Sequence, residues 1–129
     1  MYTVVRFIGT PEKRAELEAV GHALNRAVPG SYDGFDRGPE GDRRFSCSLA
    51  SEGDWFAHRR QIMAFLAKCG PVLDQCRESH VDIQFDTAIE PQDGRPSVVV
   101  GLLVDPELMQ ILIGAGASLV FSVYRGGDG

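Results

Sequence analysis

The sequence predicts one α+β domain with a mainly antiparallel sheet and helices on one face. Segments of alternating apolar and polar residues, typical of half-buried strands, are interspersed with segments whose apolar residues recur at helical spacing. The 129 residues are enough for one domain with a sizeable core. No repeat or linker divides them, so we expect a single domain over residues 1–129.

The chain opens with a predicted strand and helix. Residues 2–8 are rich in aromatic and β-branched side chains, which predicts a strand that ends at Gly9. The Thr-Pro-Glu sequence at residues 10–12 then begins a helix, because threonine caps the first turn, proline fits it and glutamate complements the helix dipole. An apolar stripe continues to Val28, and the Pro-Gly pair at residues 29–30 ends this helix.

A glycine-rich stretch, the Gly30–Arg43 loop, comes next and shows no periodicity. Loops of this length are often functional. Tyr32 and Phe35 are its only large apolar residues. We favour the interpretation that they pin the loop to the body of the domain. The alternative is that they are exposed anchors for a partner.

Two basic doublets stand out, Arg43 with Arg44 and a second pair at residues 59–60. They could contact a phosphate or an acidic partner if the fold brings them together. We favour the simpler interpretation that they are exposed and paired with Asp42 and Asp54.

The middle of the chain predicts a strand, a long helix and another strand. Residues 44–50 alternate, after which Ser51 or Asp54 can cap a helix. The apolar stripe of this helix consists of Trp55, Ile62, Leu66, Cys69 and Leu73. Because the Gly-Pro pair at residues 70–71 interrupts it and proline removes a helical hydrogen bond, we expect a kink or two abutting helices. Residues 80–85 alternate again, and we expect the lone tryptophan in the core.

The C-terminal third predicts a hairpin, a helix and a last strand. Residues 90–94 form a turn, and the apolar run at residues 98–104 predicts a central strand that returns from it. Asp105 begins a short apolar helix, residues 114–116 end it, and residues 119–124 form the last strand. From Arg44 onward the order β-α-β-β-α-β is the ferredoxin-like unit. The first strand and helix are an addition to that unit.

The uncovered face of this sheet is expected to be polar. Asp82 and Asp86 point outward from the third strand, with Gln84 between them. Four residues of strand separate the two carboxylates by about 13 Å. Since that distance is too large for a shared proton, we interpret them as solvated charges and as candidate contacts for a partner.

The net charge of −5 lies in the second half of the chain. Residues 1–60 contain nine Lys/Arg and nine Asp/Glu, whereas residues 61–129 contain four and nine. Such a surface repels nucleic acid and attracts a basic partner, although the simpler explanation, which we favour, is that the charge keeps the protein soluble. No apolar run is long enough to span a bilayer and no signal peptide is evident, so we expect no membrane partner and a cytoplasmic location.

No residue pattern predicts catalysis or metal binding. His22, His58 and His80 are isolated in sequence, and we interpret each as an ordinary surface or half-buried histidine. Cys76 and His80 stand four residues apart, but two ligands do not make a metal site. Together with Cys47, the cysteines show the irregular spacing of reduced thiols. We therefore expect no cofactor and favour a non-enzymatic role.

The C-terminal segment resembles the signature of a known family. Its matching residues are Val104, Asp105, Pro106, Glu107, Leu108, Leu112, Gly116, Val123 and Tyr124. They follow the order of strand, acidic-capped helix, glycine-containing loop and final strand seen in the uncharacterised bacterial family called domain of unknown function 4279. The resemblance implies a fold and a bacterial origin but no established activity. Because such domains are sometimes found beside toxin systems, it also implies an immunity role as one option.

Two hypotheses from different classes remain. The first is a non-enzymatic protein-interaction module, in one version an immunity protein that neutralises a basic toxin. The alternative is a small-molecule-binding sensor or small enzyme with a pocket beside the Gly30–Arg43 loop. A homodimer through a sheet edge is compatible with both. The candidate interaction residues are Tyr32, Phe35, Arg43, Arg44, Asp82 and Asp86.

Overall fold

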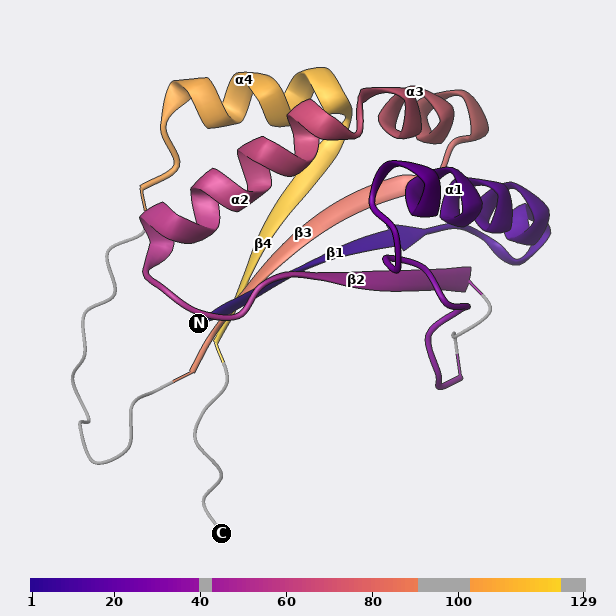
Figure 1. Ribbon diagram of the computed structural model, residues 1–129, viewed down its shortest axis with the longest axis horizontal. Coiled ribbons are helices and arrows are strands. Elements are labelled where there is room, and N and C mark those ends of the chain that lie inside the picture. Colours follow the sequence, from indigo (N-terminus) through magenta and orange to yellow (C-terminus); the bar gives the residue numbers. More distant parts are fainter. Residues whose placement is uncertain (40–42, 91–102, 124–129) are drawn as a thin grey trace, which may run out of the picture.

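The computed structural model describes residues 1–39, 43–90 and 103–123, which form a sheet with helices on one of its faces (Figure 1). A short 3-10 turn, η1 (Pro11–Lys13), precedes the first helix. The elements are β1 (Tyr2–Ile8), α1 (Arg14–Ala27), β2 (Arg44–Ala50), α2 (Trp55–Lys68), α3 (Gly70–Ser79), β3 (Asp82–Ile89), α4 (Pro106–Ala115) and β4 (Ala117–Val123). None of these helices is long and apolar enough to cross a membrane.

The four strands lie in the order β2-β1-β3-β4. β1 pairs antiparallel with both β2 and β3, and β3 pairs parallel with β4. The predicted α+β class is confirmed, and the sheet is mixed, with two antiparallel pairings and one parallel pairing. The N-terminal strand, expected as an addition to a ferredoxin-like unit, is a central strand. It lies between β2 and β3, and its backbone groups pair with both of these strands.

The strand predictions hold for β1 and β2, whose bounds match the alternating segments. β3 begins two residues later than predicted, because His80 takes a left-handed conformation (φ 55°) as the C-cap of α3. It also runs on to Ile89, since Thr87 and Ala88 are buried in the sheet. The predicted strand at residues 98–104 lies largely outside the described residues, and its last two residues are not in a strand. The predicted turn at residues 90–94 also lies outside the described residues, except for Glu90.

The predicted helices are present among the described residues, but of their expected N-caps only the one that begins α2 makes a side-chain hydrogen bond. Residues 70–71 separate two abutting helices, α2 and α3, as the Gly-Pro pair indicated. Asp54 caps α2, because its carboxylate accepts the backbone N–H of Ala57 at 3.0 Å. Thr10 makes no side-chain capping bond, contrary to expectation. Gly116 ends α4 in the left-handed conformation that glycine adopts without strain (φ 67°).

The core fills the space between the sheet and the helices. Every second side chain of β1 and β3 points into it, which follows from the two-residue period of a strand. Its largest fully buried apolar side chains are Trp55, Phe7, Phe45, Phe85, Leu17, Leu24, Ile62 and Leu108. The predicted core position of the tryptophan is thus confirmed, and Phe7 stacks on Phe45 with ring centroids 4.7 Å apart.

Candidate functional site

The face of the sheet opposite the helices is here called the open face (Figure 1). It carries polar side chains from all four described strands. They alternate along each strand with the side chains that point into the core. Its polar members are Arg44, Ser46 and Ser48 on β2, Arg6 on β1, Asp82, Gln84 and Asp86 on β3, and Ser118 and Ser122 on β4.

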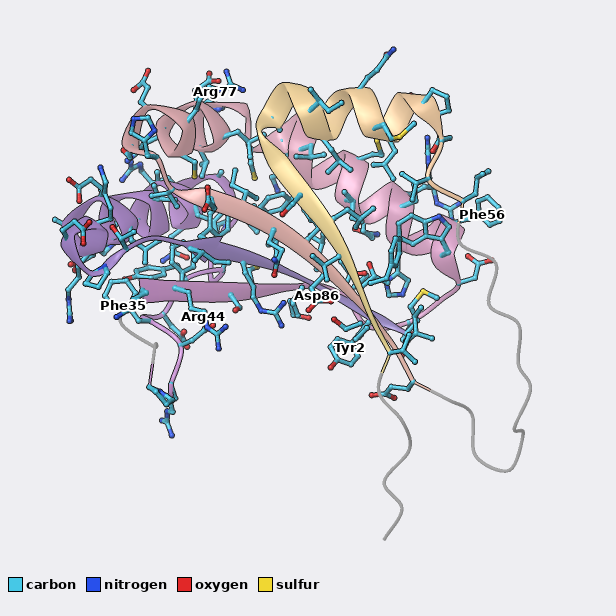
Figure 2. All side chains as sticks on the ribbon, turned by 180° about the vertical axis from the view of Figure 1, so that it is seen from behind. Tyr2, Phe35, Arg44, Phe56, Arg77 and Asp86 are labelled. Carbon is cyan, nitrogen blue, oxygen red and sulfur yellow. The ribbon has the colours of Figure 1, made fainter. Side chains whose placement is uncertain are left out.

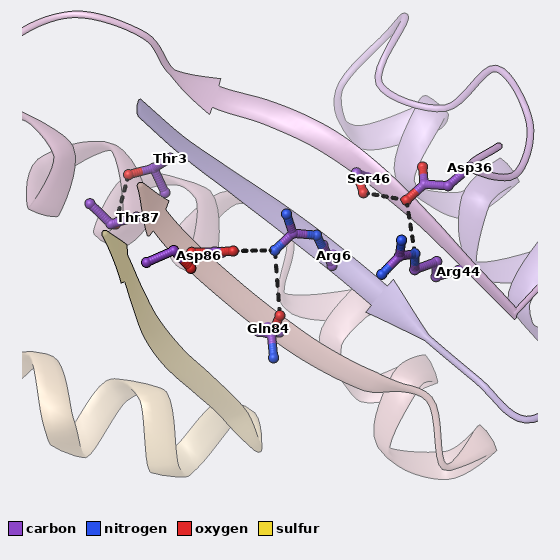
Figure 3. A network of polar contacts seen from close by, with 9 residues as sticks. Thr3, Arg6, Asp36, Arg44, Ser46, Gln84, Asp86 and Thr87 are labelled. Atoms are coloured by element: carbon purple, nitrogen blue, oxygen red, sulfur yellow. Dashed lines mark hydrogen bonds and ion pairs between the residues drawn. The ribbon is translucent and has the colours of Figure 1, made fainter. Parts of the chain in front are cut away.

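An ion pair between Arg6 and Asp86 lies at the centre of the open face (Figure 3). Arg6 Nη1 lies 2.5 Å from Asp86 Oδ2 and 3.5 Å from the side-chain oxygen of Gln84. The second carboxylate oxygen of Asp86 accepts a hydrogen bond of 2.8 Å from the hydroxyl of Ser122. These contacts join β1, β3 and β4, and they fix the direction of the Arg6 guanidinium.

The interpretation of Asp86 as a solvated charge is wrong. Its exposed fraction is 6%, whereas Asp82 on the same face is exposed. The physical reason is the register of β1 on β3, which places Arg6 opposite Gln84 and diagonal to Asp86. A long guanidinium side chain reaches such a diagonal neighbour. Asp86 is thereby neutralised, and Asp82 is the described acidic side chain of β3 that faces water.

A second group of polar contacts ties the long loop to the start of β2 (Figure 3). The backbone N–H of Asp36 donates to the carbonyl of Arg44 at 2.9 Å, and the Ser46 hydroxyl donates to the Asp36 carboxylate at 2.7 Å. Arg44 Nε lies 3.5 Å from the same carboxylate. Arg44 is therefore paired with Asp36, while its predicted partner, Asp42, lies outside the described residues. Arg43 is exposed.

Tyr32 and Phe35 pin the loop to the body of the domain, as favoured from the sequence. The side-chain amide of Asn25 binds both backbone groups of Tyr32, at 2.6 and 2.8 Å. The Tyr32 ring packs edge-on against Phe45, with centroids 4.7 Å apart. Phe35 packs against the core, under the guanidinium of Arg14. Both aromatic rings are half-buried, so their role as exposed anchors finds no support in this geometry.

The helix-facing side of the sheet contains a buried polar cluster of Thr3, His58 and Thr87. The Thr3 hydroxyl lies 2.8 Å from His58 Nδ1 and 2.8 Å from the Thr87 hydroxyl. All three side chains are completely buried. His58 Nε2 has no hydrogen-bond partner. The cluster links β1, β3 and α2, and its hydroxyl–imidazole contact has the spacing of a nucleophile with its base. Complete burial keeps any substrate away, which favours a structural role.

Burial lowers the pKa of the His58 imidazole, and the ammonium group of Met1 lowers it further. The backbone carbonyls of residues 52 and 53 and the carboxylate of Asp54 act in the opposite direction but more weakly. The folded protein therefore favours the neutral imidazole, since a charged one would lose its hydration on burial.

The prediction that all three histidines are ordinary surface or half-buried residues is wrong for His58. His22 and His80 are exposed, as expected. A signal was present in the sequence, because His58 lies three residues after Trp55 and four before Ile62. Those spacings place it on the apolar stripe of α2.

The second arginine doublet lies at the start of α2. Arg59 donates two parallel hydrogen bonds to Asp105, at 2.8 and 2.7 Å, and lies 3.3 Å from Glu107. These hydrogen bonds lower the pKa of the Asp105 carboxyl. Asp54 was the expected partner of this doublet, but Arg59 pairs with Asp105 instead and Asp54 caps α2. Both carboxylate oxygens of Asp105 accept hydrogen bonds from Arg59, and Asp105 makes no capping bond to α4.

A hollow of about 360 Å³ lies beside this ion pair. Its lining residues are Phe56, Arg59, Arg60, Leu103 and Asp105. Phe56 and Leu103 are 57% and 60% exposed, and the indole N–H of Trp55 donates to the carbonyl of Leu103 at 2.7 Å. Figure 2 shows Phe56 near one end of the molecule and Arg44 well apart from it, on the other side of Asp86, so the two arginine doublets do not form one site.

Among residues 1–39, 43–90 and 103–123, no group of three or more His, Cys, Asp or Glu side chains could hold a metal ion. The three cysteines are free, with Cys69 and Cys76 buried. No protein-family model matches the chain, and no curated protein or solved structure matches it. The candidate site therefore depends on the geometry of the described residues alone.

Proposed function

We propose that the chain is a protein-interaction module that binds a partner protein through the open face of its sheet. The observation that carries this proposal is the network of Arg6, Asp86 and Ser122, which holds a charged pair rigid in the middle of a face that no described helix covers.

The chemistry of the open face suits a protein partner. Half-buried apolar side chains, Val4, Ile8 and Val120, alternate with the fixed polar groups of the network. Protein interfaces combine such apolar area with a few well-placed polar groups, and arginine is enriched in them. Because the contacts to Asp86 already restrict the Arg6 side chain, binding would cost little further side-chain entropy.

A more specific version of the proposal is that the partner protein is basic. A basic toxin would need free carboxylates on this face, and the ion pair with Arg6 neutralises one of the two that the sequence offered. Asp82 is exposed and carries what support remains for a basic partner. In this version the chain is an immunity protein whose Asp82 steers the toxin to the open face.

The test compares two matched arginine substitutions. A photo-crosslinking residue at Ser48, which is exposed on the open face, first identifies the partner in the native cell. Ser48→Arg should then weaken binding of the purified partner at least about tenfold, because a long charged side chain blocks the face. Ala64→Arg, on the exposed side of α2, should leave binding unchanged. Equal effects of the two substitutions would refute the open face as the binding surface.

The basic-partner version has its own pair of variants. Asp82→Lys should slow association and remove its salt dependence, whereas Glu78→Lys on α3 should do neither. Unchanged association of the Asp82→Lys variant would leave the open face as a binding surface but would exclude a basic partner.

A second candidate function is small-molecule binding in the hollow at the start of α2. Its volume is in the range of ligand sites, and Arg60 is an exposed cation next to the exposed ring of Phe56. We propose this site in place of a pocket beside the Gly30–Arg43 loop, because Tyr32 and Phe35 pack that loop onto the core. A thermal-shift screen of small aromatic carboxylates should give a stabilising ligand whose effect is lost in Arg60→Ala. A ligand that stabilises both proteins equally would exclude the hollow.

A further inference from the structure

The two edges of the sheet differ in how they are protected. β2, at one edge, begins with a charged residue, and Asp36 of the long loop occupies the outer carbonyl of Arg44 at 2.9 Å. β4, at the other edge, has the sequence Ala-Ser-Leu-Val-Phe-Ser-Val, with no charged residue and no proline. Within the described ranges it pairs only with β3. Proteins usually protect such an edge with charges, prolines or bulges, because its free backbone groups pair readily with another strand.

The helix next to this edge also has an unpartnered apolar flank. α4 lies beside α2 on the β4 side of the sheet (Figures 1 and 2). Met109 and Ile113 are one helical turn apart and are 45% and 78% exposed. Glu107 points toward α2, since it contacts Arg59 there. Positions two residues apart on a helix point about 160° apart, so Met109 points away from α2, toward the side of the β4 edge.

We propose that a second copy of this chain docks along β4 and the outer flank of α4. The occupant is a second copy because the strand is complementary to itself. In antiparallel pairing centred on Val120, each residue of β4 faces one of its own kind. Val120 faces Val120, Ser118 faces Ser122, Leu119 faces Phe121, and Ala117 faces Val123. No like charges meet anywhere along this pairing, and the exposed Val123 and Ile113 become covered.

This arrangement extends the sheet across both copies. A two-fold axis perpendicular to the sheet reverses the strand direction while keeping each face on its own side. The described helices of both copies then lie on one side of a sheet that joins the four described strands of each copy. The two open faces lie together on the other side. The inference concerns a different surface from the proposed function and does not depend on it.

The first test is the mass of the protein in solution. Sedimentation of the full chain should give twice the 14.1 kDa of one copy. Ile113→Glu should weaken dimerisation by about tenfold or more, because it places a carboxylate in the apolar contact twice per dimer. Phe56→Glu is the matched control, since Phe56 is also an exposed apolar residue on a helix but lies on α2. A wild-type protein that stays monomeric, or equal weakening by both substitutions, would overturn the proposal.

The second test fixes the register. Under mild oxidation Val120→Cys should form an intermolecular disulfide, because the two copies of residue 120 face each other across the axis. Ser118→Cys should not, since four residues of strand place its two copies about 13 Å apart. The wild-type chain controls for the native cysteines. Cross-linking of Ser118→Cys alone would overturn the proposed register, because it would centre the pairing on residue 118. A dimer in which neither variant cross-links would show that the copies meet through another surface.

Discussion

Acid should destabilise this protein through His58. The imidazole is completely buried, its Nε2 has no hydrogen-bond partner, and burial lowers its pKa below the ordinary value of 6.5. The unfolded chain therefore binds a proton at a pH where the folded chain does not. The contribution of His58 to the free energy of unfolding is most favourable above pH 6.5 and falls as the pH drops below that value.

The magnitude follows from one proton. A difference of one bound proton changes the free energy of unfolding by about 1.4 kcal/mol per pH unit. Between pH 6.5 and about pH 5 this amounts to at most about 2 kcal/mol, before the carboxyl groups begin to titrate. The His58→Leu variant loses the hydrogen bond to Thr3 but also loses a buried nitrogen without a partner. At high pH, losing the hydrogen bond lowers the free energy of unfolding and losing the unpartnered nitrogen raises it, each by about 1–2 kcal/mol, so the two effects oppose each other.

The assay is urea unfolding followed by the fluorescence of Trp55, the only tryptophan, which is 2% exposed in the folded protein. We expect the two proteins to differ by no more than about 1 kcal/mol at pH 8 and His58→Leu to be the more stable at pH 5. His80→Leu, at an exposed histidine, should keep the wild-type pH dependence. Parallel pH curves for wild type and His58→Leu would refute the reasoning.

Three further outcomes can be measured by urea unfolding and thiol labelling. Gly21→Ala should lower the free energy of unfolding by about 1–3 kcal/mol, because a Cβ at this position would lie 2.6 Å from the ring of Tyr32. Gly70→Ala, whose Cβ would meet open space, should be neutral or slightly stabilising. Asp86→Ala should lower the free energy of unfolding by about 2 kcal/mol, because it leaves the charge of Arg6 without its partner. Asp82→Ala should lower it by less than about 0.5 kcal/mol, because Asp82 is exposed. Burial raises the pKa of the Cys76 thiol to about 12, so iodoacetamide at pH 8 should label Cys76 only after unfolding. Rapid labelling of Cys76 in the folded protein would contradict its burial.

Local sequence signals predicted most of the secondary structure. The alternation of residues 2–8 and 44–50 gave two strands with their observed bounds, and the Gly-Pro pair at residues 70–71 indicated two helices. These signals work because strand periodicity, caps and proline act over a few neighbouring residues. The start of β3 was missed because the left-handed conformation of His80 has no such local signal.

The sequence by itself determined most of the strands and helices, which of their faces are apolar, and where the acidic residues lie along the chain. Only the tertiary structure decided that β1 is a central strand and that Arg6 neutralises Asp86. It likewise decided that Arg59 binds Asp105, 46 residues away, and that His58 is buried against Thr3, 55 residues away. The physical reason is that period and capping depend on neighbours in the chain. Ion pairing and burial depend on strand order and register, which bring together residues that no local pattern connects.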